Sequence, residues 1–176
     1  MQRRTLLKGA AIGGLVALGA GFWALPTGAA PAALSLDGAR QVLEGLKGQV
    51  LASISGWTPT EVFNHCAQSI EYSLDGYPEL KPAWFRNSIG PAAFAVFSAR
   101  GAMRHPLTEV IPGAAPLAEP ASQELALQRL QLAFERFAAH TGELKPHFAY
   151  GALDHAEYAR AHVLHLYNHL SLIRPA

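Results

Sequence analysis

The chain has 176 residues, half of them hydrophobic, which is enough for one domain with a substantial core. Its formal charge of +1 depends on Arg3, Arg4 and Lys8, because the other 11 basic residues stand against 13 acidic ones and give −2. No basic stripe of the kind that binds nucleic acid is present, and the single cysteine, Cys66, excludes an intramolecular disulfide and CxxC-type zinc or haem motifs.

Residues 1–30 have the layout of an export signal. A basic start is followed by an apolar run, Ala10 to Leu25, and then by small residues after Pro26. The run is short for a membrane-spanning helix and is diluted by four glycines. We therefore expect a cleaved signal and a single mature domain, 31–176; the alternative is an uncleaved N-terminal anchor.

The stretch RRTLLKG, at positions 3–9, resembles the twin-arginine export motif, although Gln2 and Leu6 depart from its commonest form. This resemblance implies the twin-arginine export machinery as a partner and a periplasmic or otherwise exported location. Because that route carries folded proteins, often with a cofactor already loaded, it also favours a bound metal.

Gly and Pro punctuate a series of helical patterns in the rest of the chain. Pairs of residues with capping-box spacing precede two of them, Thr58 with Glu61 and Asp154 with Glu157. The patterns predict helices over 36–53, 58–74, 122–140 and 154–173, and two short helical pieces within 84–100, separated at Gly90-Pro91.

The segment 105–122 contains four prolines and is predicted to be an extended connector. No stretch alternates polar and β-branched residues for long enough to predict a sheet. The fold class expected is therefore an all-α helical bundle with one long crossover.

Three histidines lie on the last predicted helix within the stretch HVLHLYNHL. At about 100° per residue, His162, His165 and His169 all fall within about 40° of Tyr158 on one stripe. His165 and His169 are four residues apart, so their rings stand one turn apart on one face and can converge on one cation. Buried imidazoles on so apolar a helix need partners, and a shared metal supplies them.

A third ligand is expected from the second predicted helix. His65 lies there on a stripe with Val62, Cys66, Ser69 and Ile70, which directs it inward. Two histidines on one helix and one on another make the three-ligand arrangement, with an open position, that catalytic metal sites use. For His65 alone, a buried histidine bonded to a backbone group or hydroxyl remains the alternative.

Other residues near these three are given supporting roles. His162 is expected as a further ligand or as a donor beside the ligands, and His147 and Tyr150 either reach the mouth of the site or only fix their loop. Cys66 is expected to be a small buried hydrophobic residue, Glu61 a cap, and His105, His140 and His155 surface residues.

Three blocks in order resemble the DUF1569 family of the DinB/YfiT-like metalloenzyme superfamily. The blocks are WTPTEVFNHCAQSIEYS (57–73), PHFAYGAL (146–153) and the His165/His169 pair. The resemblance covers 36–173. It implies a four-helix bundle of up-down-down-up topology, with a crossover formed by 84–100 and the proline-rich connector.

The resemblance also implies a metal site of His65, His165 and His169, with water completing a zinc or nickel shell. Many relatives carry a polar stretch after the last histidine, whereas LSLI follows His169 here. Characterised superfamily members include thiol-dependent isomerases and transferases. The expectation is thus an exported metal-binding protein acting on a small-molecule substrate or thiol as a transferase, isomerase or hydrolase, with its homodimeric state left open.

Two rival functions stay open at this point. In one, the chain is a non-catalytic structural or interaction protein whose histidines satisfy one another in the core. In the other, facing histidines hold a haem non-covalently, which the spacing of His165 and His169 favours less.

Overall fold

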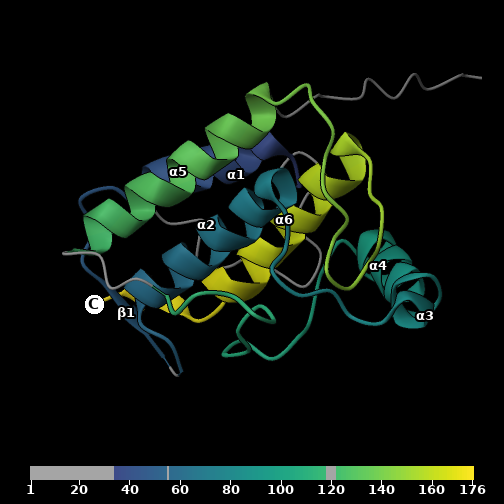
Figure 1. Ribbon diagram of the computed structural model, residues 1–176. Coiled ribbons are helices and arrows are strands. Elements are labelled where there is room, and N and C mark those ends of the chain that lie inside the picture. Colours follow the sequence, from purple (N-terminus) through teal and green to yellow (C-terminus); the bar gives the residue numbers. More distant parts are fainter. Residues whose placement is uncertain (1–33, 55, 118–121) are drawn as a thin grey trace, which may run out of the picture.

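The structure, a computed structural model, describes residues 34–54, 56–117 and 122–176 (Figure 1), so the expected export signal, 1–30, lies outside the described residues. The chain is mostly helical, as predicted. No helix among the described residues is both long and apolar enough to cross a membrane. The elements in chain order are α1 (Leu36–Gly45), β1 (Leu51–Ser53), α2 (Pro59–Asp75), α3 (Ala83–Arg86), α4 (Ile89–Arg100), α5 (Gln123–Ala139), α6 (His155–Leu170) and β2 (Ile173–Pro175).

The two helices that carry the histidines both begin with the capping boxes expected from the sequence. At α2, the Thr58 hydroxyl accepts from the Glu61 amide and the Glu61 carboxylate accepts from the Thr58 amide, at 3.3 and 2.7 Å. At α6, Asp154 and Glu157 exchange the same pair of bonds, at 2.8 and 2.9 Å. Each cap satisfies donors that would otherwise be left unpaired in the first turn, which sets where the helix begins.

The structure contains a small sheet, which the sequence did not predict. Strands β1 and β2 pair antiparallel, with Ala52 opposite Arg174. Each strand has only three residues, which is too short to show an alternating pattern.

The helices that precede the two strands, α1 and α6, are both shorter than predicted. The first ends at Gly45 instead of near Ser53, because Gly48 turns the chain at a φ of 69°. The last ends at Leu170 instead of Ile173; Pro175 disfavours helical geometry at the preceding residue, and the chain there is extended in β2.

The predicted break in 84–100 is present but lies earlier than Gly90-Pro91. Helix α3 ends at Arg86 and α4 begins at Ile89, so Gly90 and Pro91 fall within the first turn of α4. A proline is tolerated there because the amide it lacks would have no intrahelical partner.

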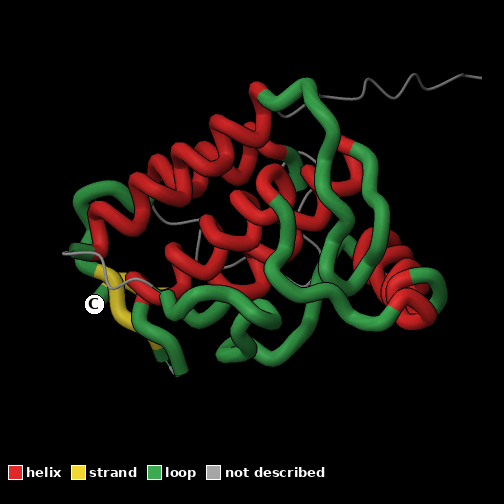
Figure 2. Tube along the Cα trace, in the orientation of Figure 1, coloured by secondary structure: helices red, strands yellow, loops and turns green. Residues whose placement is uncertain are grey.

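Helices α1, α2, α5 and α6 lie side by side, and α3 and α4 are set to one side of them (Figures 1 and 2). Helix α2 packs against α5 and α6, α1 packs against the same two helices, and α4 packs against α6. The side chains between them form one core, whose largest fully buried members include Phe63, Phe134, Phe137, Tyr158 and Leu166. The histidines of α2 and α6 therefore face each other across a contact between packed helices.

Candidate metal centre

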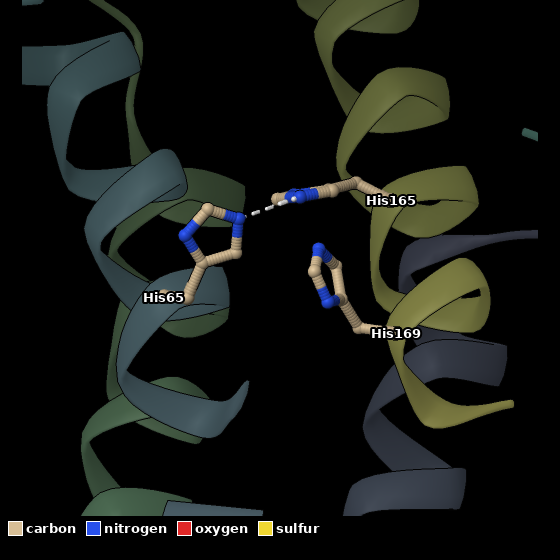
Figure 3. A group of neighbouring side chains, drawn as sticks. All are labelled: His65, His165 and His169. Carbon is tan, nitrogen blue, oxygen red and sulfur yellow. Dashed lines mark hydrogen bonds between the residues drawn. The ribbon is translucent and has the colours of Figure 1, made fainter. Parts of the chain in front are cut away.

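Three histidine side chains from α2 and α6 converge on one another (Figure 3). His65 extends from α2, and His165 and His169 extend from successive turns of α6. Each offers one ring nitrogen to a set whose members all lie within 4.8 Å of one another, and the Nε2 atoms of His65 and His165 are 3.2 Å apart. The structure thus brings together the three residues expected as ligands.

Most of this cluster is withdrawn from water and has few hydrogen-bond partners. His65 and His169 are buried, at 2% and 0% exposure, and His165 is partly buried. Within the described part of the chain, both ring nitrogens of His169 and the Nδ1 of His65 have no hydrogen-bond partner. Unpaired buried nitrogens cost about 1–3 kcal/mol each, so such a cluster is costly unless another group binds to it.

Burial keeps these imidazoles neutral. Desolvation, with a further contribution from His105, lowers the pKa of His65 to about 4. Desolvation and then the neighbouring His65 and His105 lower the pKa of His169, and burial and the other histidines hold the pKa of His165 well below its usual range. Because a metal binds the neutral form of imidazole, these rings are available as ligands across the physiological pH range.

Trp57, which precedes the cap of α2, covers one side of the cluster. Its ring stacks on that of His169, with centroids 6.0 Å apart and planes 10° apart, and it lies 4.8 Å from the ring of His65. These contacts limit the orientations open to both imidazoles and exclude water from that side.

A cavity of about 180 Å³ adjoins the cluster. Its lining includes His65 and His165 together with polar side chains from several segments, among them Ser69, Lys81 and Glu109. A small molecule in this cavity can therefore reach two of the three clustered rings.

The three residues given supporting roles, His147, Tyr150 and His162, all line this cavity.

 His162 Nε2 lies 3.2 Å from the hydroxyl of Ser73, which itself donates to the Ile70 carbonyl, so His162 is the donor of that pair. His147 Nδ1 accepts from the amides of Ala149 and Tyr150, both at 3.1 Å. His147 therefore fixes the loop before α6, and His162 ties α6 to α2.

Burial also sets the protonation of the cavity wall. Desolvation, and then His155, lowers the pKa of His162 to about 3, while desolvation and His162 hold the pKa of His147 well below its usual range. Burial raises the pKa of Tyr150 to about 12. The wall therefore presents neutral imidazoles and a neutral phenol at pH 7.

Other residues singled out in the sequence behave as expected. Cys66 is buried in the core, where desolvation raises the pKa of its thiol, and Glu61 caps α2. His155 is exposed, although its ring stacks on Phe137 with centroids 4.5 Å apart, and His140 is partly exposed.

His105 was also expected at the surface, but its ring Nε2 is buried. The residue as a whole is partly buried, and its ring lies 5.1 Å from both His165 and His169. The connector that carries it is held against the molecule by buried side chains on either side, Met103 and Ile111. No helical spacing relates His105 to the other histidines, so the sequence pattern contained no signal for this approach.

Comparison with known protein families gives a match over most of the chain. Residues 32–176 match the model of a family described as "Protein of unknown function (DUF1569)". No curated protein and no solved structure matches the chain. Since the match spans most of the sequence, including all three clustered histidines, the chain belongs to the DUF1569 family.

Proposed function

We propose that this chain is an exported, DinB-like metal-binding protein in which His65, His165 and His169 hold one divalent cation. The observation that carries the proposal is the mutual approach of three neutral imidazoles, two buried and one partly buried, whose ligand nitrogens lie within 4.8 Å of one another. Three imidazole donors suit zinc and nickel, the two ions we favour.

The donor set fits such an ion on two grounds. One ion would bind one ring nitrogen of each histidine, and for His169 it would supply a partner that the described part of the protein does not provide. The ligands come from two packed helices, so the core holds their spacing without help from a mobile loop. A bound ion would supply a Lewis acid with an open coordination position.

The residues around the cluster would then bind and orient a small molecule, with a low-molecular-weight thiol as one candidate. His65 and His165 line the cavity that would admit it, and neutral His147, His162 and Tyr150 offer polar groups on its wall. Trp57 covers the cluster on another side and excludes water. Transferase, isomerase or hydrolase chemistry fits this arrangement.

The proposal extends to the topology of the helical bundle and to the place of the protein in the cell. We propose the up-down-down-up four-helix bundle of the DinB-like superfamily, formed by α1, α2, α5 and α6, with α3, α4 and the proline-rich connector as its crossover. Residues 1–30 would direct the folded protein through the twin-arginine machinery to the periplasm. The support is the basic, apolar and small-residue layout of that segment.

A non-catalytic helical protein is the second candidate. The close approach of His65 Nε2 to His165 Nε2, at 3.2 Å, is the observation in its favour, because two neutral imidazoles can share a hydrogen bond without a metal. This second candidate gives no role to the two unpaired ring nitrogens of His169.

Metal content separates the two. The mature protein is stripped with a chelator, offered zinc, nickel or iron, desalted and analysed for bound metal. We expect about one zinc or nickel ion per chain in the wild type and a loss of at least 90% in the His165→Ala, His169→Ala double variant, which removes two of three ligands. His140→Ala, outside the cluster, serves as the control and should keep its metal. A wild type that retains none of the three ions would leave the non-catalytic protein as the better reading.

A further inference from the structure

A fourth imidazole approaches the cluster from a segment far from α2 and α6. His105 lies on the connector between α4 and α5, and its ring centroid is 5.1 Å from those of His165 and His169. The three clustered rings are themselves 4.7–5.0 Å apart. His105 therefore approaches the rings of α6 almost as closely as they approach each other and His65.

The hydrogen bond that His105 makes determines which of its nitrogens is free. Its Nδ1 lies 2.8 Å from the carbonyl oxygen of Pro106, which can only accept, so Nδ1 carries the proton and Nε2 carries the lone pair. This Nε2 is buried and has no hydrogen-bond partner among the described residues. A histidine that binds a metal almost always donates its other ring N–H in this way, commonly to a backbone carbonyl.

The spacing of the rings agrees with a shared ion. Imidazoles that bind one tetrahedral zinc at about 2.0–2.1 Å have ring centroids about 5 Å apart. The distances from His105 to His165 and His169 match that value. Its nitrogens are outside the set that lies within 4.8 Å of one another, so ligation requires the connector to move inward.

We propose that His105 is a fourth protein ligand, which makes the centre a four-histidine site closed by the connector. This inference rests on the metal site proposed above. His105 also lines the cavity, together with His65 and His165. A small molecule entering from the cavity would then bind the metal by displacing His105 or by raising the coordination number to five. The connector would thereby control access to the metal.

The test uses cobalt as a visible probe of the site, with His105→Ala compared against His140→Ala. Competition against a chromophoric chelator gives the affinity, and the visible absorption of bound cobalt reports the ligand set. We expect His105→Ala to bind cobalt and zinc about 10–100-fold more weakly than the wild type, with an altered cobalt spectrum. Added imidazole should restore the wild-type spectrum in this variant, because it can occupy the position that the side chain left. His140→Ala should match the wild type.

Each outcome distinguishes the two proposals. If the wild type binds no metal, the three-histidine site and the role of His105 are both overturned. If the wild type binds metal and His105→Ala shows the same affinity and spectrum, only the assignment of His105 is overturned. Weaker binding with an unaltered spectrum and no response to imidazole also overturns it, because the connector would then act on the site only through packing.

Discussion

Burial keeps the histidines around the cavity uncharged, and His162 shows how it does so. His162 is 3% exposed, and it lies between Phe137 and Tyr158, with ring centroids at 4.9 and 5.3 Å. Its Nε2–H donates to Ser73, which satisfies the neutral form, while no carboxylate among its described contacts would stabilise the charged form. The result is a pKa of about 3 instead of 6.5.

This shift predicts that the metal-free protein loses stability as the pH falls. Below pH 6.5 the unfolded chain protonates at His162 and the folded chain does not until about pH 3, so the proton binds preferentially to the unfolded state. At pH 4.5 this residue alone should cost roughly 2–3 kcal/mol relative to pH 7.5. The His162→Gln variant keeps an N–H donor but does not titrate, so its loss over the same range should be smaller by that amount.

Urea unfolding of both proteins at pH 7.5 and 4.5, in the presence of a chelator, measures the difference. Equal losses in the wild type and in His162→Gln would show that His162 gains its proton in the folded state.

At the scale of elements, α4 and the loop before α6 approach each other too closely for a side chain between them. A Cβ added at Gly90 would lie 1.8 Å from the carbonyl oxygen of Ala149 and 2.9 Å from its carbonyl carbon. The same loop carries His147 and Tyr150 to the cavity wall. Position 90 therefore requires glycine. The atoms that a Cβ would meet belong to the backbone of the loop, which cannot move aside as the end of a flexible side chain could.

Gly90→Ala should destabilise the protein by about 1–3 kcal/mol, because α4 and the loop must separate to admit the methyl group. Gly45→Ala is the matched control: it also lies in a helix, but nothing lies within 4 Å of its added Cβ. We expect that change to be neutral or to stabilise by up to about 1 kcal/mol, since alanine favours helix. Thermal unfolding of both variants checks this, and an unchanged midpoint for Gly90→Ala would contradict the close approach.

At the scale of the whole molecule, the cluster depends on how α2 and α6 are held relative to each other. Arg129 of α5 binds α2 through both carboxylate oxygens of Glu71, at 3.0 and 2.7 Å, and through the Asn64 side chain at 2.9 Å. The common core packs α2 against both α5 and α6. An ion bound by His65, His165 and His169 would connect two helices that the fold already holds together.

Metal should therefore stabilise the folded state in proportion to its affinity. A ligand that binds only the folded protein contributes about 2.7 kcal/mol when its free concentration is a hundred times the dissociation constant. We expect zinc or nickel to raise the unfolding temperature of the wild type and to have little effect on His165→Ala. Calorimetry at increasing metal concentration checks this, and shifts of equal size in both proteins would point to binding elsewhere.

Local signals in the sequence predicted the helical elements well. The boxes Thr58/Glu61 and Asp154/Glu157 mark the starts of α2 and α6 because a cap depends only on residues three positions apart. Helix ends and short strands were predicted less well. The sheet of β1 and β2 pairs residues more than a hundred positions apart, and three-residue strands carry no periodicity of their own.

The sequence by itself determined which histidines converge within a helix and which helices carry them. His165 and His169 share a face because of the helical repeat, and the apolar stripe around His65 directed it inward, so this part of the site followed from local geometry. Only the tertiary structure decided that His105 approaches the cluster and that His147, His162 and Tyr150 line a cavity beside it. The reason is physical: the path of an irregular connector is determined by what its side chains pack against, and no repeat in the sequence encodes that packing.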